Sequence, residues 1–214
     1  MLAFKTEGII LKRRNFGEAD RILTVFSQSR GKISVLAKGV RRITSRRGGN
    51  VELLNRVQMF LHPGKNLLIL TEAVALDTYP KIKEELTLST YGFHLIELVD
   101  KLTAENQENR SLYIEFMEVL KRLESNPRQI FIRAFEVRIL SNLGFWSLGQ
   151  LGDLSNTMKD ILKILELSPW GEIEKIELKA NQAMELERIL RYYLEKVIEG
   201  SLKSRQFLKE VNGG

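Results

Sequence analysis

The chain has 214 residues, of which 43% are hydrophobic, so it can form one large domain or two small ones around a real core. It contains no cysteine, which excludes disulfides, cysteine-ligated zinc and thiol catalysis. The formal net charge of +6 favours a polyanionic partner and belongs to the N-terminal part: residues 1–79 hold 14 Lys and Arg against 6 Asp and Glu, whereas the remainder holds 19 against 21.

The first 80 residues predict a small β-barrel. Short β-branched and aliphatic runs alternate there with Gly and charged residues, and the third run places Ile33, Val35 and Ala37 on one face. Five short antiparallel strands suit a closed barrel such as the OB-fold, because closure hides the edges of the sheet. The expected strands cover residues 8–12, 21–26, 32–37, 51–61 and 67–76.

From residue 81 onward, apolar residues recur at helical spacing and predict an α-helical bundle. The third helix is apolar on more than one side, so we expect it at the centre of the bundle. The expected helices are 81–103, a second capped by Asn109 or Ser111, a third from Pro127 to just before Gly144, a weaker one over 156–167, and a long one from a cap at Asn181 to about 199. The predicted fold class is therefore α+β, with an OB-fold nucleic-acid-binding domain at residues 1–80 and an α-helical domain at residues 81–214.

The most informative segment is the basic stretch AKGVRRITSRRGGN at residues 37–50, which holds five cations, no acid, and Gly near both ends. Arg makes bidentate contacts with phosphate oxygens and Gly lets the backbone approach closely, whereas nothing here reads a base edge in a fixed register. We expect unpaired cations on a mobile loop that binds DNA with little sequence preference; the alternative is a solvated hairpin loop that serves solubility. The candidate DNA-binding residues are Lys38, Arg41, Arg42, Arg46 and Arg47, joined by Lys12, Arg13, Arg14, Arg30 and Lys32 from neighbouring barrel segments.

One aromatic residue, Phe16, lies in a polar turn beside three cations. It could stack on a base, as aromatic residues do in proteins that bind single strands, or it could plug one end of the barrel. Both interpretations remain open from the sequence.

Catalytic and metal sites are poorly supported. The only histidines are His62 and His94, so we expect no metal and no cofactor. The acids of the basic region are mostly isolated, and the Gly-Lys-Ser or Gly-Lys-Thr end of a Walker loop is missing, so we expect no enzyme. Glu18 and Asp20 are interpreted as turn residues, with Asp20 available to pair with Arg21.

Membrane segments and targeting signals are not evident in the sequence. No run of 18 apolar residues occurs, and the N-terminal stretch offers no small-residue cleavage pattern. We therefore expect a cytoplasmic protein without membrane contacts.

Three motifs follow one another in the basic region: Gly-Glu-x-Asp-Arg at residues 17–21, Gly-Lys at residues 31–32 and Ala-Lys-Gly at residues 37–39. Together they resemble the N-terminal signature of the RecO family of bacterial recombination mediators. Weaker similarity continues through residues 72–80, 132–145 and 202–208, so the resemblance spans nearly the whole chain.

The resemblance implies an N-terminal OB-fold, a helical domain, binding of single- and double-stranded DNA, and strand annealing. It also implies a non-enzymatic role in loading recombinase onto coated single strands, in the cytoplasm at the nucleoid, with RecR and single-stranded-DNA-binding protein as partners. Arg133 lies in the segment that matches the family's contact with the acidic tail of single-stranded-DNA-binding protein. A cation beside an apolar groove suits such a tail; a structural pair with Glu136 is the alternative.

The chain departs from the family pattern in one place. Many members carry a four-cysteine zinc module after a Leu-Gly-aromatic sequence, which stands here as Leu143, Gly144 and Phe145. Residues 145–180 replace that module without a cysteine, so metal binding does not carry over. Two other classes of function stay open: an interaction scaffold with an incidental basic barrel, and a metal-dependent nuclease.

Overall fold

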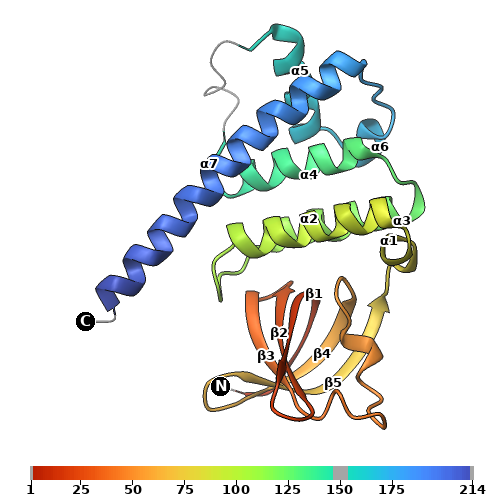
Figure 1. Ribbon diagram of the computed structural model, residues 1–214. Helices are drawn as coiled ribbons and strands as arrows, with labels where there is room; N and C mark the ends of the chain where they lie inside the picture. The colour runs from red at the N-terminus through yellow and green to blue at the C-terminus, as the bar shows by residue number, and fades with distance from the viewer. Residues whose placement is uncertain (1, 147–153, 213–214) are drawn as a thin grey trace. The chain divides into compact units, whose positions relative to one another are not determined.

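The computed structural model describes residues 2–146 and 154–212, with side chains up to residue 199 (Figure 1). Its N-terminal part is a closed barrel of five strands in the order β1-β2-β3-β5-β4, which returns to β1. All neighbouring strands are antiparallel except β3 and β5. The strands are β1 Phe4–Phe16, β2 Asp20–Ser27, β3 Gly31–Ala37, β4 Arg56–Pro63 and β5 Leu68–Asp77. This arrangement confirms the predicted OB-fold barrel.

The barrel interior is filled by alternating side chains from all five strands. Ile33, Val35 and Ala37 are each at most 1% exposed, so the alternation predicted for the third strand is confirmed. A close approach between β1 and β2 requires a glycine at position 8, because a Cβ there would lie 2.5 Å from Val25 Cγ1.

The fourth strand begins later than predicted. Residues Gly49–Val51 form a short 3-10 helix, η1, and Leu54 has a positive φ of 67°, which interrupts an extended backbone. Leu54 is nevertheless buried, and its backbone N–H donates to the Ile10 carbonyl at 3.0 Å. The β-branched pattern that predicted a strand from residue 51 therefore reflects burial in a non-strand segment.

Three helices pack with the barrel in a first compact unit, residues 1–125: α1 Pro80–Glu84, α2 Leu86–Leu102 and α3 Arg110–Ser125. Glu85 is extended, with φ −89° and ψ 122°, so the helix predicted over 81–103 is divided in two. Of the two caps predicted for the next helix, Asn109 is used: its Oδ1 accepts the Leu112 N–H at 2.9 Å. In Figure 1, α2 lies across one end of the barrel.

A second compact unit, residues 126–214, contains α4 Gln129–Asn142, α5 Asn156–Leu167, α6 Trp170–Ile173 and α7 Ala180–Asn212. The central position predicted for the third helix is confirmed, because α4 contacts α5, α6 and α7 and all but one of its residues from 130 to 140 are buried. Two predicted helix starts are wrong. The helix α4 begins at Gln129 after the cap residue Arg128, two residues beyond the predicted first residue Pro127, and the predicted cap Asn181 lies inside the first turn of α7.

The two compact units divide after Ser125, whereas the domain boundary predicted at residue 80 marks the change from strands to helices. Residues 154–179, within the region predicted to replace the zinc module, form α5, α6 and their connections, and α7 begins at residue 180; residues 147–153 lie outside the described residues. None of the described helices has the combination of length and apolar character that crossing a membrane requires.

Candidate nucleic-acid interface

The basic segment between β3 and η1 is folded into consecutive turns. Backbone N–H groups donate from Arg42 to Gly39 at 3.2 Å, from Ser45 to Arg42 at 2.8 Å and from Gly48 to Ser45 at 3.4 Å. Gly39 opens the series with a φ of +63°, a conformation that glycine adopts without strain. The mobile backbone expected from the sequence is therefore replaced by a hydrogen-bonded loop, which we call the cationic loop, residues 38–48.

Arg47 fastens this loop to the barrel. One guanidinium nitrogen donates to the Leu70 and Thr71 carbonyls of β5, at 2.9 and 3.2 Å, and another donates to the Lys38 carbonyl at 2.9 Å. These acceptors are neutral, so the charge of Arg47 is not compensated by them. Arg47 therefore acts as an anchor that still contributes positive potential to the loop.

The turn between β1 and β2 holds the other side of the loop. Arg41 donates from its backbone to the Ala19 carbonyl at 2.9 Å and from its guanidinium to the Gly17 carbonyl at 3.3 Å. The Asp20 carboxylate accepts the Gly39 N–H at 2.7 Å. Asp20 is thus a loop-positioning residue; in place of the predicted Asp20–Arg21 pair, Arg21 pairs with Glu52 at 3.3 Å.

A hollow opens within the cationic loop. Lys38, Arg42 and Arg46 are exposed, and across the described residues none of the three forms an ion pair. Asp20 is the one acid among the lining residues, and its carboxylate already accepts a backbone N–H. The hollow is therefore strongly cationic and of a kind that receives phosphate groups.

The other predicted cations differ in how far they are already paired. Lys12 is 61% exposed and pairs with Asp100, whereas Arg13 pairs with Glu52 and is 23% exposed. Arg14 is exposed, and no partner for it is found among the described residues. The Arg30 guanidinium stacks over the Phe4 ring at 3.9 Å from the centroid.

Lys32 does not lie where the sequence predicted. Its side chain is 6% exposed, its amine donates to the Asp100 carbonyl, and the Asp100 carboxylate lies 3.8 Å away. The Asn106 N–H donates to the Lys32 carbonyl at 2.8 Å, so the connection between α2 and α3 covers this strand. The amine joins the barrel to α2 and does not face solvent, so its prediction as a DNA contact is wrong for this structure.

Phe16 ends β1 with 50% of its surface exposed. A plug at the end of the barrel would be buried, so that interpretation is wrong. Stacking on a base remains a prediction that the exposure permits.

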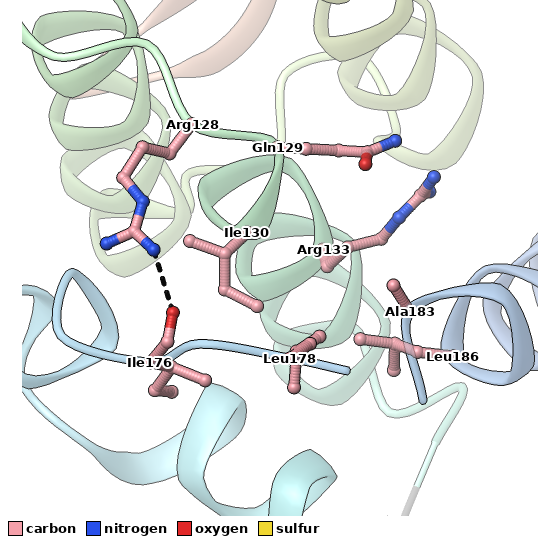
Figure 2. Close-up of a pocket in the computed structure, with 8 residues that line it drawn as sticks. All are labelled: Arg128, Gln129, Ile130, Arg133, Ile176, Leu178, Ala183 and Leu186. Carbon is pink, nitrogen blue, oxygen red and sulfur yellow. Dashed lines mark hydrogen bonds between the residues drawn. The ribbon is translucent and has the colours of Figure 1, made fainter. Parts of the chain in front are cut away.

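The helical unit contains a second candidate site, a cavity of about 250 Å³ shown in Figure 2. Arg133 lines it but is only 15% exposed, because its guanidinium pairs with Glu136 at 2.9 Å and with Glu187 at 3.0 Å. The structural pair with Glu136 is thus confirmed. Arg128, which the sequence did not single out, donates to the Ile176 carbonyl at 2.8 Å. The remaining lining residues are Gln129, Ile130, Ile176, Leu178, Ala183 and Leu186.

Metal ligands do not gather in the described part of the chain, where no group of three or more His, Asp and Glu side chains is arranged to hold an ion.

Family models match most of the chain. Residues 1–79 match the model described as recombination protein O N terminal, and residues 83–146 match the recombination protein O C terminal model. The chain belongs to the RecO family. The second match ends at residue 146.

Two relatives named DNA repair protein RecO agree with the family models. The chain is 28% identical over 241 positions to the DNA repair protein RecO of Pelotomaculum thermopropionicum, covering 97% of this chain and 94% of that protein. It is 36% identical over 144 positions to the DNA repair protein RecO of Acetivibrio thermocellus, covering 66% of this chain and 57% of that protein. The first alignment, 241 positions, exceeds the 214 residues of this chain, so that relative has residues that this chain lacks.

Proposed function

We propose that this RecO-family protein is a non-enzymatic mediator of DNA repair and recombination that binds single- and double-stranded DNA at the cationic loop. The observation that carries the proposal is the hollow with three exposed, uncompensated cations, Lys38, Arg42 and Arg46. Phosphates bound there would release counterions, which supplies affinity without sequence preference. Arg47 and Arg41 shape the hollow. Lys12, Arg13 and Arg14 on β1 are proposed to add to the cationic surface, whereas Arg30, also a proposed DNA contact, lies in the turn before β3, at the other end of that strand from Lys38.

The proposed mechanism for annealing is charge neutralisation. Two complementary strands repel each other through their phosphates, and cations on the protein reduce that repulsion while the bases stay free to pair. No covalent chemistry is required. The same binding would support loading of a recombinase onto single strands coated by single-stranded-DNA-binding protein, at the nucleoid in the cytoplasm.

A titration of single-stranded DNA at several salt concentrations tests this proposal. Replacing Lys38, Arg42 and Arg46 together by Ala should weaken binding, slow annealing and reduce the slope of log affinity against log salt by about 2, since each lost phosphate contact removes about 0.7. A matched control replaces Lys163, Lys175 and Lys179, three exposed cations of the helical unit, and should leave the slope unchanged. An unchanged slope in the loop variant, or cleavage of labelled DNA with magnesium or manganese, would contradict the proposal.

We also propose that the cavity of the helical unit binds the acidic tail of single-stranded-DNA-binding protein. Ile130, Leu178 and Leu186 offer apolar contacts beside two cations. Arg133 already faces two carboxylates, so a peptide carboxylate would displace Glu187 from it, whereas Arg128 offers a guanidinium held by a neutral carbonyl. RecR is proposed as a further partner on the family resemblance, without an assigned surface.

Fluorescence anisotropy of a labelled acidic tail peptide tests the cavity. Arg128→Ala should weaken binding about tenfold, because charged hydrogen bonds to a carboxylate contribute about 1.5–3 kcal/mol. Glu187→Gln should strengthen binding, since it removes the competing carboxylate from Arg133. Equal affinity in wild type and both variants would place the peptide elsewhere.

A further inference from the structure

The tip of the cationic loop carries an apolar side chain. Ile43 has a relative exposure of 106%, the highest of the large apolar side chains in the described chain. It follows Arg42 in a four-residue turn closed by the Ser45 N–H, which donates to the Arg42 carbonyl at 2.8 Å. The turn therefore holds Ile43 outward, with no apolar neighbour to cover it.

Exposed apolar residues occur singly on most proteins and need no function. Ile43 differs because of its surroundings and its stiffness. Arg42 precedes it, Arg46 follows three residues later, and both are exposed. A β-branched side chain has few rotamers to lose when a ligand covers it. The loop thus presents one rigid apolar group between cations.

This combination suits one kind of ligand. The cations attract a polyanion, and the apolar tip is best covered by a ligand that also offers an apolar surface close to its charged groups. Nucleic acid offers both, because each base, with its flat apolar faces, is joined through its sugar to a phosphate. Apolar residues inserted between neighbouring bases are a known way in which proteins part a base stack.

We propose that Ile43 is a wedge that enters between two neighbouring bases of a strand whose phosphates are held by Arg42 and Arg46. The proposal rests on the DNA binding proposed above and adds a contact to the bases. Parting a stack costs less in a single strand than in a paired duplex, so the wedge favours single strands. It also leaves bases unstacked and accessible to a complementary strand.

The loop geometry supports a preformed wedge. Arg47 fixes one side of the loop to β5, and the Asp20 carboxylate fixes Gly39 on the other. The Arg42–Ser45 turn lies between these two attachments, so its apex does not depend on DNA for its conformation. A preorganised tip loses little freedom on binding.

Single strands that carry the fluorescent base 2-aminopurine provide the test, because its emission rises when it is unstacked. Wild-type protein should raise the emission, whereas Ile43→Ala and Ile43→Thr should raise it much less and bind about fivefold more weakly, with an unchanged salt slope. The control is Leu86→Ala, which removes an 84% exposed apolar side chain from α2 and should behave as wild type.

Three outcomes would overturn the wedge. Equal emission and affinity in Ile43→Ala and wild type would overturn the wedge alone, provided that the variant with Lys38, Arg42 and Arg46 replaced still shows a smaller salt slope than wild type. If that variant has the same salt slope as wild type, the proposed DNA binding by the loop is overturned as well. Binding of wild type, but not Ile43→Ala, to anionic phospholipid vesicles with no change in 2-aminopurine emission would assign the tip to a membrane surface.

Discussion

The cationic loop of the first compact unit and Arg133 of the second are held by different kinds of acceptor. In the barrel unit, Arg41 and Arg47 donate to backbone carbonyls, so they hold the loop in shape and keep their charge available to a ligand. In the helical unit, Arg133 lies between Glu136 and Glu187, so its charge is compensated within the protein. The acceptor of a guanidinium therefore decides whether its charge is compensated within the protein or remains available to a polyanion.

The two compact units also differ in net charge. Residues 1–125 hold 20 Lys and Arg against 15 Asp and Glu, whereas residues 126–214 hold 13 against 12. The excess of positive charge in the first unit lies in the barrel. Among the described residues, the cationic loop holds a group of cations that form no ion pairs.

We expect the barrel unit, residues 1–125, and the helical unit, residues 126–214, to unfold separately. Gly31→Ala should destabilise the barrel unit by more than about 3 kcal/mol, because it adds a Cβ 1.8 Å from the Gln107 carbonyl oxygen at a residue with φ of +63°. Both tryptophans, Trp146 and Trp170, lie in the helical unit, so urea unfolding followed by their fluorescence should be unchanged. Far-ultraviolet circular dichroism should report the loss.

A matched glycine controls that result. Gly17 also has a positive φ, +56°, but no atom lies within 4 Å of a Cβ added there. Gly17→Ala should therefore cost only about 1 kcal/mol, the strain of the left-handed conformation. Similar losses in Gly17→Ala and Gly31→Ala would contradict the assigned contact with Gln107.

The second prediction concerns the compensated arginine. Arg133→Ala should destabilise the helical unit by about 2–3 kcal/mol, because it removes the guanidinium from Glu136, a carboxylate only 2% exposed. Arg191→Ala breaks an exposed pair with the same Glu187 and should cost less than about 0.5 kcal/mol. Tryptophan fluorescence in urea measures both, and equal losses would show that burial does not distinguish these pairs.

The third prediction separates anchoring from charge. Arg47→Lys keeps the positive charge but cannot donate to the Leu70, Thr71 and Lys38 carbonyls together, since an ammonium lacks the planar fork. Hydrogen exchange of the Ser45 and Gly48 amides should quicken, and affinity for single-stranded DNA should fall about fivefold to tenfold, corresponding to about 1 kcal/mol of lost preorganisation.

Arg46→Lys is the matched control for that change. Arg46 is exposed and its side chain forms no ion pair within the described residues, so this variant should stay within about twofold of wild type. A larger loss in Arg46→Lys than in Arg47→Lys would show that Arg47 is not the anchor.

Two buried tyrosines should make the stability of the barrel unit depend on pH. Burial raises the pKa of the Tyr79 and Tyr113 hydroxyls above the ordinary value near 10. The folded state therefore holds these protons at pH values where the unfolded state has released them. The free energy of unfolding should be constant below about pH 10 and fall by about 1 kcal/mol per tyrosine for each pH unit above it.

Urea unfolding by circular dichroism between pH 9 and pH 11 measures this loss. Tyr113→Phe removes one of the two hydroxyls and should make the stability of the barrel unit less sensitive to pH in this range. An identical dependence in Tyr113→Phe and wild type would exclude Tyr113 as a source.

Part of the fold and of the site follows from local patterns. The alternation at Ile33, Val35 and Ala37 indicated a half-buried strand, and five such runs separated by turn residues indicated a closed barrel. The cations and glycines of residues 37–50 are close together in the chain and no acid lies among them, so the sequence alone indicated the cationic loop. Helix starts were less predictable: Pro127 and Asn181 have suitable side chains, yet the backbone begins its helices one or two residues away.

Periodicity and charge are properties of neighbouring residues, so the barrel, the helical bundle and the position of the cationic loop could be predicted from the chain alone. The role of each cation depends on contacts that form only on folding. Lys32 meets Asp100, 68 residues away in the chain, and Arg47 meets carbonyls of β5, 23 and 24 residues away. A side chain's partners come from segments that folding brings together. Burial therefore removed Lys32 from the surface, and hydrogen bonds to β5 anchored Arg47.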